Sequence, residues 1–250
     1  MMNSRNVYKV INRSRGIGSF LQRRFLTLQA VQTPNENALK FIARDAKFLP
    51  EDLASAVEID SLAEADERSP IATELFKISG VRSIMVGPDF ITVNKIDKSL
   101  SNNDELDWNT LSPKVVDTIT KATRAGIPAI TESFKHDLQQ ELDEAQDDDD
   151  DVVYEIKEVI STRIKPALQD DGGDIHFRSF DESTGTVFIK LKGACKSCSL
   201  SEDTLKNGIE SMLMHYIPEV RTVKSVLDPE EEIALQEFEK MERRLKAKAP

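Results

Sequence analysis

Apolar residues recur every three to four positions in the chain after residue 151. This spacing predicts a helix that gives out between Pro166 and the Gly172-Gly173 pair, because proline and paired glycines interrupt helices. The apolar stripe of this helix consists of Val152, Ile156, Val159, Ile160 and Ile164.

Two strands are predicted next, at 175–179 and 187–192, where apolar and polar residues alternate. The second alternation places Lys190 and Lys192 on the face opposite its aliphatic residues. A second helix should end at Pro218, and a last strand should run through 220–226. The apolar stripe of the second helix consists of Leu205, Ile209, Met212, Leu213 and Tyr216. The predicted order in this domain, residues 152–227, is therefore helix, strand, strand, helix, strand.

The first half of the chain carries its own helix and turn signals. Ser69-Pro70 predicts a helix start, with serine as the cap and proline in the first turn. Runs at 81–86 and 90–95 predict a hairpin around Gly87-Pro88-Asp89. Ser112-Pro113 repeats the capping pattern and predicts a helix that ends at Gly126. We assign residues 28–128 to this domain, which contains no cysteine or histidine.

Between the two halves, eight of the eleven residues from Glu141 to Asp151 are acidic. Repulsion at this density opposes compact folding, so we interpret 129–151 as an acidic, solvated linker and name no cation site there. The fold class predicted is α+β, with two small α/β domains joined by this linker. Residues 228–250 follow as an amphipathic helix, whose apolar stripe either packs within the chain or docks a client or assembly factor.

The charge of the chain is unevenly distributed. The first acid is Glu36, and the 27 residues at the start carry six basic residues among serines and apolar residues. This composition is typical of a mitochondrial presequence, which we assign to 1–27, and it predicts a protein of the mitochondrial matrix. Without that segment 27 basic residues remain against 44 acids, a net charge of −17. Such a charge argues against general nucleic-acid binding, and no apolar run suggests membrane insertion.

Both cysteines of the chain, Cys195 and Cys198, lie in one Cys-x-x-Cys loop between the second strand and the second helix. Lysines 190, 192 and 196 cluster around this loop, and no acid occurs between Glu182 and Glu202. In an acidic chain this local excess of positive charge suggests that the lysines neutralise a bound anion. The ordinary alternative is that they line a solvent-exposed strand face. Ser199 to Glu202 fits a capping box, so the thiols should precede the positive end of a helix, which favours thiolate.

Two thiolates are half of a four-thiolate metal site. Structural zinc sites and iron-sulfur clusters ordinarily take four ligands, so a dimer that brings two loops together could hold a cluster or a zinc ion. His215 is a poor third ligand, because it follows the loop by about sixteen helical residues, or roughly 24 Å. A dithiol oxidoreductase would use the same two thiols, and the residue spacing alone leaves that class open.

Longer motifs in both halves resemble one known family. Residues 163–175, the loop at 193–198 and residues 204–210 strongly resemble the carboxy-terminal domain of NifU-like proteins. Residues 69–76 and 89–93 look like the amino-terminal domain of the Nfu branch. One departure is Ser199-Leu200-Ser201, where many members have Pro-Ser-Ser.

This resemblance implies a late-acting iron-sulfur scaffold or carrier rather than an enzyme. Two protomers of such a carrier would share a labile [4Fe-4S] cluster through Cys195 and Cys198. The homodimer would receive the cluster from assembly factors and deliver it to client apoproteins such as lipoate synthase and respiratory enzymes. The residues alone do not separate [2Fe-2S] from [4Fe-4S], because both take four thiolates.

Overall fold

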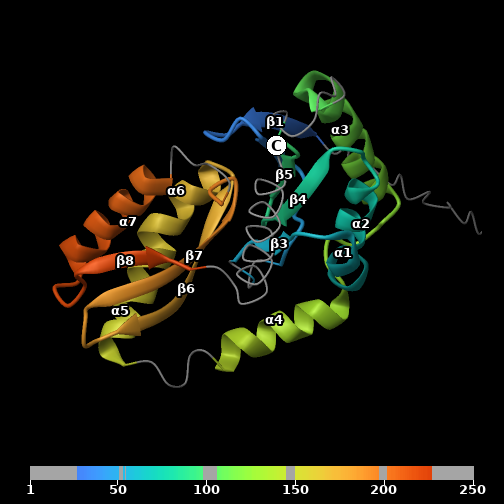
Figure 1. Cartoon of the computed structure of the whole chain (residues 1–250). Coiled ribbons are helices and arrows are strands. Elements are labelled where there is room, and N and C mark those ends of the chain that lie inside the picture. Colours follow the sequence, from blue (N-terminus) through green and yellow to red (C-terminus); the bar gives the residue numbers. More distant parts are fainter. Residues whose placement is uncertain are drawn as a thin grey trace, which may run out of the picture.

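The computed structural model describes residues 27–50, 53, 55–97, 106–144, 150–196 and 202–226, with the backbone alone described at 141–144 and 202–205. The predicted presequence, except for Thr27, and the predicted tail helix at 228–250 lie outside these residues. The described elements form two units that lie side by side (Figure 1). We call them the first domain and the second domain. No helix among the described residues is long and apolar enough to cross a membrane.

The first domain is built on a five-stranded sheet in which every neighbouring pair is antiparallel. The predicted hairpin is confirmed, since β4 (Val81–Val86) pairs with β5 (Phe90–Lys95). The sheet order is β1-β2-β5-β4-β3, and the three remaining strands are β1 (Leu28–Gln32), β2 (Ala38–Ala43) and β3 (Val57–Ile59).

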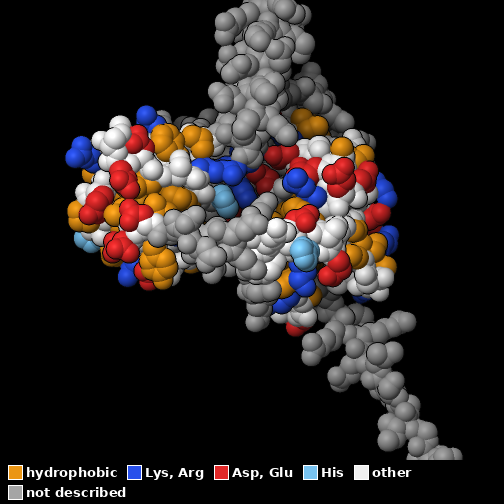
Figure 2. All heavy atoms as spheres, turned by 90° about the horizontal axis from the view of Figure 1, so that it is seen from below, with side chains coloured by type: hydrophobic (Ala, Val, Ile, Leu, Met, Phe, Trp, Pro, Cys, Tyr) orange, Lys and Arg blue, Asp and Glu red, His pale blue; other side chains and the backbone are white. Residues whose placement is uncertain are grey.

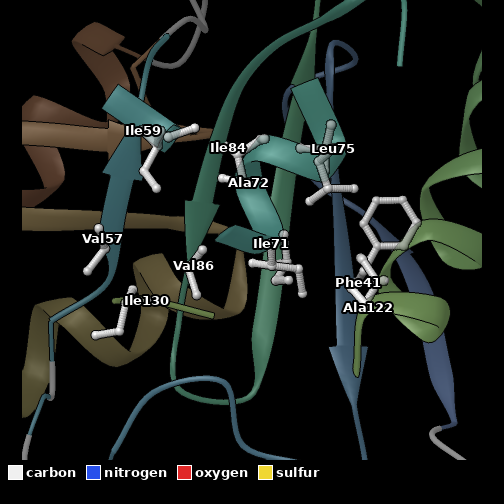
Figure 3. Close-up of a cluster of buried hydrophobic side chains, with 14 of the residues drawn as sticks. Phe41, Val57, Ile59, Ile71, Ala72, Leu75, Ile84, Val86, Ala122 and Ile130 are labelled. Atoms are coloured by element: carbon white, nitrogen blue, oxygen red, sulfur yellow. The ribbon is translucent and has the colours of Figure 1, made fainter. Parts of the chain in front are cut away.

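Helices cover one face of this sheet and enclose the main core. Helices α1 (Leu62–Arg68), α2 (Pro70–Phe76) and α3 (Trp108–Arg124) lie together on that face (Figure 1). Figure 3 shows Ile71, Ala72 and Leu75 of α2 among the strand side chains. Ile84 and Val86 of β4 are 0% exposed in this cluster. Alternate residues of β4 and β5 therefore face the helices, and their neighbours face the opposite side.

Capping explains where two of these helices begin. Ser69 caps α2 as predicted, because its hydroxyl accepts a hydrogen bond from the amide of Ala72. The predicted start at Ser112-Pro113 is wrong. Helix α3 begins at Trp108, where the Asp107 side chain accepts a hydrogen bond from the amide of Asn109. Pro113 consequently lies inside the helix.

Part of the range assigned to the linker is helical. Helix α4 (Glu132–Glu144) follows Ile130, which is 5% exposed and belongs to the core of the first domain. Phe134 and Leu138 pack against the same core, and the Arg68 guanidinium lies 5.1 Å from the Phe134 ring centre. We did not predict this helix from the sequence, because the acidic composition obscures its few apolar positions.

The second domain has the predicted order of elements. Its sheet order is β6-β7-β8, with β6 (Gly173–Asp181) antiparallel and β8 (Thr222–Ser225) parallel to β7 (Thr186–Gly193). The first helical stretch runs through α5 (Asp151–Val159), a π-helical turn at Ile160–Ile164 and α6 (Lys165–Asp170). It therefore passes Pro166 and ends at Asp170, within the interval predicted between Pro166 and Gly172-Gly173. The wider π turn just before Pro166 gives the ring room that a regular α-turn would not.

Helix α7 (Glu202–Tyr216) packs on the sheet with a narrower stripe than predicted. Ile209 and Leu213 are 3% and 0% exposed, as expected for core positions. Met212 and Tyr216, which were predicted on the same apolar stripe, are 38% and 42% exposed and lie outside the core. The Arg163 guanidinium lies over the Tyr216 ring, 4.6 Å from its centre, so this aromatic residue contacts a cation at the surface.

The sheet face that the helices leave uncovered in the first domain meets the second domain. Strand β7 lies against β4 and β5. Met85 on β4 lies next to Gly193, and Thr92 on β5 lies next to Gly172. Gly172 directly precedes β6, and Gly193 is the last residue of β7. The first domain therefore covers the end of the second domain from which the Cys-x-x-Cys loop begins.

Candidate metal-binding loop

The loop that contains the cysteines connects β7 to α7. Strand β7 ends at Gly193 and α7 begins at Glu202, so Cys195 precedes the amino-terminal end of a 15-residue helix. Cys198 and the serines of the predicted capping box lie outside the described residues. The described part of the loop is therefore Gly193 to Lys196.

A glycine conformation and two hydrogen bonds define this turn. Gly193 has a φ of +63°, which favours glycine over residues with a side chain. The amide of Lys196 donates to the carbonyl of Gly193 at 3.2 Å, and the amide of Ala194 donates to the carbonyl of Gly172 at 3.2 Å. A Cβ atom on Gly193 would also lie 2.6 Å from the sulfur of Met85 in the first domain. The turn thus combines a left-handed conformation with close contact to a neighbouring domain.

The Cys195 side chain points into the second domain. The residue is 7% exposed and belongs to the hydrophobic cluster that includes Ile175, Leu191 and Ile209. Its sulfur lies directly over Gly173, where a Cβ atom would clash with it. A thiolate is a soft ligand for iron or zinc, so the donor chemistry of Cys195 fits either metal.

The lysines near the loop have acidic partners in this structure. Lys196 Nζ lies 2.7 Å from Asp60 Oδ2 and 3.6 Å from Glu58 Oε2, both in the first domain. Lys190 is only 6% exposed and Lys192 is half-buried. Neither lysine therefore lies on a solvent-exposed strand face, as the alternative interpretation of ordinary surface lysines requires. Burial lowers the pKa of Lys192, and the negative charges of Asp174 and Glu58 oppose that shift.

Glu58 is the acid most closely involved with the loop. Its Oε1 accepts a hydrogen bond from the amide of Gly193 at 3.0 Å, and its side chain is 5% exposed. Burial raises the pKa of Glu58, repulsion from Asp60 adds to the shift, and the charge of Lys196 opposes it. Its Oε2 accepts no hydrogen bond from the described residues. The carboxylate is therefore held in a poorly solvated position beside the turn.

Other hydrogen bonds join the same two surfaces. The amide of Ala56 donates to Asp174 Oδ2 at 2.8 Å, and Asn35 Nδ2 donates to the carbonyl of Ala194 at 2.9 Å. Lys40 Nζ donates to the carbonyl of Gln169 at 2.7 Å, at the end of α6. Figure 2 shows basic side chains of one domain next to acidic side chains of the other at this junction.

The residues of the first domain that contact the loop were not predicted from the sequence. Gly172-Gly173 was used only as a helix end signal, but Asp174 lies directly after it in β6, is 1% exposed and accepts the amide of Ala56. Glu58 could have been recognised in the sequence as an acid inside the short apolar run Val57-Glu58-Ile59. His215 lies in the last turn of α7, where its ring packs against Tyr216. Among the described residues, no three histidine, cysteine or acidic side chains gather as a metal site.

Comparison with known proteins agrees with this two-domain arrangement. Residues 28–126 match the family described as "Scaffold protein Nfu/NifU N terminal", and residues 156–224 match the family described as "NifU-like domain". The chain is 40% identical over 238 residues to "NifU-like protein, mitochondrial" of Saccharomyces cerevisiae, covering 90% of each chain. It is 43% identical over 207 residues to the human "NFU1 iron-sulfur cluster scaffold homolog, mitochondrial", covering 83% of this chain and 74% of the human one.

A solution NMR structure of the S. cerevisiae NifU-like protein covers 53% of this chain and 99% of its own, with 27% identity and a TM-score of 0.37. The sequence relationships alone identify the family, since they extend over most of the chain, and both relatives are named as mitochondrial. The chain therefore belongs to the NifU-like family, as a mitochondrial member with an Nfu amino-terminal domain and a NifU-like domain.

Proposed function

We propose that this protein is an iron-sulfur cluster scaffold and carrier. Its cargo is a labile [4Fe-4S] cluster, held between two protomers by Cys195 and Cys198 of each chain. The protein transfers this cluster to mitochondrial client apoproteins, such as lipoate synthase and respiratory enzymes. It acts by binding and release and is not an enzyme.

One observation carries this proposal: the only two cysteines in 250 residues share a single loop between β7 and α7. Iron-sulfur clusters ordinarily take four cysteine thiolates, so two loops supply the required number. The relative in humans is named as an iron-sulfur cluster scaffold homolog, which agrees with this use of the loop.

The charges around the loop support a bound anion. Lys196 follows Cys195 directly, and Lys190 and Lys192 lie on the strand that leads to it. A thiolate-ligated cluster is negatively charged, and neighbouring ammonium groups lower the cost of assembling it. The positive end of α7 acts in the same direction on a cysteine that precedes it.

Transfer follows from the small number of ligands on each chain. A cluster between two chains is exposed at their junction, where incoming thiolates of a client can replace the ligands one at a time. Each replaced pair frees one protomer, so release requires no unfolding of a closed cage. Four cysteines on one chain would hold the cluster more firmly and would suit storage or electron transfer.

Anaerobic reconstitution with ferrous iron and sulfide tests the proposal. We expect the full chain to gain the broad visible absorption and Mössbauer parameters of a [4Fe-4S] cluster. Cys195→Ala and Cys198→Ala should each lose at least about nine-tenths of the bound iron, because only two of the four thiolates would remain in each pair of chains. Tyr154→Ala is the matched control, since Tyr154 is 62% exposed on α5 in the same domain.

Two other results would overturn the assignment. A colourless dimer that retains stoichiometric zinc in competition with iron and sulfide would indicate a structural zinc site. A Cys195–Cys198 disulfide that turns over with a reductant and a protein substrate would indicate a dithiol oxidoreductase. Near-normal iron content in either cysteine variant would also contradict the proposed ligands.

A further inference from the structure

The first domain holds the cysteine loop in a closed arrangement. Glu58 accepts the amide of Gly193, Asn35 donates to the carbonyl of Ala194, and Asp60 pairs with Lys196. The loop groups in these contacts belong to the two residues before Cys195 and the one after it. The backbone just before the ligand and the side chain just after it are therefore both bonded to the first domain.

The same surface is anchored at two more places. Lys40 donates to the carbonyl of Gln169 at the end of α6, and the amide of Ala56 donates to the buried carboxylate of Asp174. Met85 fills the space beside Gly193, where no Cβ atom would fit. Because these contacts surround the base of the loop, the first domain occupies one side of the region that a second protomer would have to approach.

Acidic side chains of the first domain also form ion pairs with Lys196, the cation next to Cys195. Lys196 is 2.7 Å from Asp60 in this closed arrangement. A cluster bound at Cys195 would bring negative charge next to the same lysine, so the cluster would compete for it with Glu58 of β3 and with Asp60, which follows that strand. Two like charges near one ammonium group repel each other, and this repulsion favours separation of the first domain once a cluster is present.

We propose that the first domain is an intramolecular latch, which closes over the cysteine loop in the metal-free monomer and releases when two loops share a cluster. This inference rests on the proposed function for the step that opens the latch. The latch surface consists of Asn35, Lys40, Ala56, Glu58, Asp60 and Met85. Closure protects the loop until a cluster arrives, and opening exposes the surface through which the two protomers meet.

The amide of Ala56 reports the state of the latch. It lies in the first domain, but its hydrogen-bond acceptor is Asp174 in the second. Hydrogen exchange of this amide in the full chain should become about tenfold faster or more after cluster loading, because its protection depends on contact between the domains. The amide of Gly87, which donates to Phe90 within the first domain, and that of Ile217, which donates to Leu213 within the second, should keep their protection.

Two substitutions test closure in the metal-free protein, where no cluster is needed. Asp60→Asn removes the 2.7 Å ion pair, and Asn35→Asp replaces the donor to Ala194 while keeping the Oδ1 that accepts the amide of Asn37. Together they should speed exchange of the Ala56 amide about tenfold. Asp117→Asn is the matched control, because Asp117 pairs with Lys121 within α3.

The results separate the latch from the carrier function. Faster exchange at Ala56 in the double variant, with Gly87 and Ile217 unchanged, supports closure even if no cluster binds. Unchanged exchange at Ala56 in the double variant would overturn the latch, and so would full protection of Ala56 in a cluster-loaded dimer. Failure to bind any cluster, with the double-variant effect intact, would overturn the proposed function and the opening step but leave the closed contact established.

Discussion

The amide of Gly193 donates a hydrogen bond to Oε1 of Glu58 at 3.0 Å, although the two residues are 135 positions apart. Gly193 is two residues before Cys195, and Glu58 lies in the centre of β3. The bond therefore connects an edge strand of one domain to the candidate ligand loop of the other. The position of this loop depends on both domains.

Gly173 controls the space available to the Cys195 side chain. Gly173→Ala would place a methyl group on the cysteine sulfur and within 3.1 Å of the carbonyl of Lys192. We expect it to lower the free energy of unfolding of the second domain by about 1–3 kcal/mol, because overfilling a packed site forces neighbours to move. Urea unfolding followed by circular dichroism measures this change.

Gly208→Ala is the matched control in the same domain. Gly208 lies in α7, and apart from the backbone of its own helix and its chain neighbours, no atom of the described residues is within 4 Å of a Cβ added there. This substitution should raise stability by about 0.5–1 kcal/mol, since glycine inside a helix is unfavourable relative to alanine. Equal effects of the two alanines would show that Gly173 does not confine Cys195.

Leu213 and Met212 test the width of the apolar stripe on α7. Leu213 is 0% exposed and Met212 is 38% exposed. Leu213→Ala should cost about 2–5 kcal/mol through the cavity it leaves, whereas Met212→Ala should stay within about 0.5 kcal/mol. Thermal unfolding of both variants measures the difference in stability. Similar losses of stability would show that Met212 is packed in the core as Leu213 is.

Glu210 links α7 to β8 and gives the second domain a pH dependence. Its Oε2 accepts hydrogen bonds from the amide of Val223 at 2.8 Å and from the Thr222 hydroxyl at 2.7 Å. These bonds lower the pKa of Glu210, the Val223 amide contributing most. The stabilisation is therefore complete above the ordinary pKa of a glutamate and is lost as pH falls through the lowered value.

Glu210→Gln should remove this dependence and cost about 1 kcal/mol at neutral pH, where the carboxylate is the better acceptor. Urea unfolding at a series of pH values compares the two proteins, and their stabilities should converge as pH falls. Glu155→Gln on the exposed side of α5 is the control. Parallel curves for the wild type and Glu210→Gln would contradict the assigned role of these hydrogen bonds.

Local sequence signals predicted those elements whose determinants are close in the chain. The cap at Ser69 needs only the amide of Ala72, and the β4–β5 hairpin needs only its own turn. The order of elements in the second domain followed from hydrophobic spacing in the same way. Asp107 was missed as the cap of α3 because Ser112-Pro113 carries a stronger local signal.

The contacts around Cys195 could not be predicted in this way. Cys195 itself was found from the spacing of the two cysteines, but its burial depends on Gly173, and the loop backbone depends on Glu58 and Asn35 in another domain. Such partners are set by how the two domains pack. The lysine cluster was recognised as unusual, yet the carboxylates that meet Lys196 became apparent only in three dimensions.

Native mass spectrometry of the anaerobically reconstituted protein tests the central claim most directly. If two protomers share one cargo through Cys195 and Cys198, the spectrum should contain a species of two chains with four iron and four sulfide ions, absent from either cysteine-to-alanine variant. A single chain carrying a complete cluster, or a dimer whose cluster survives loss of either cysteine, would contradict the claim.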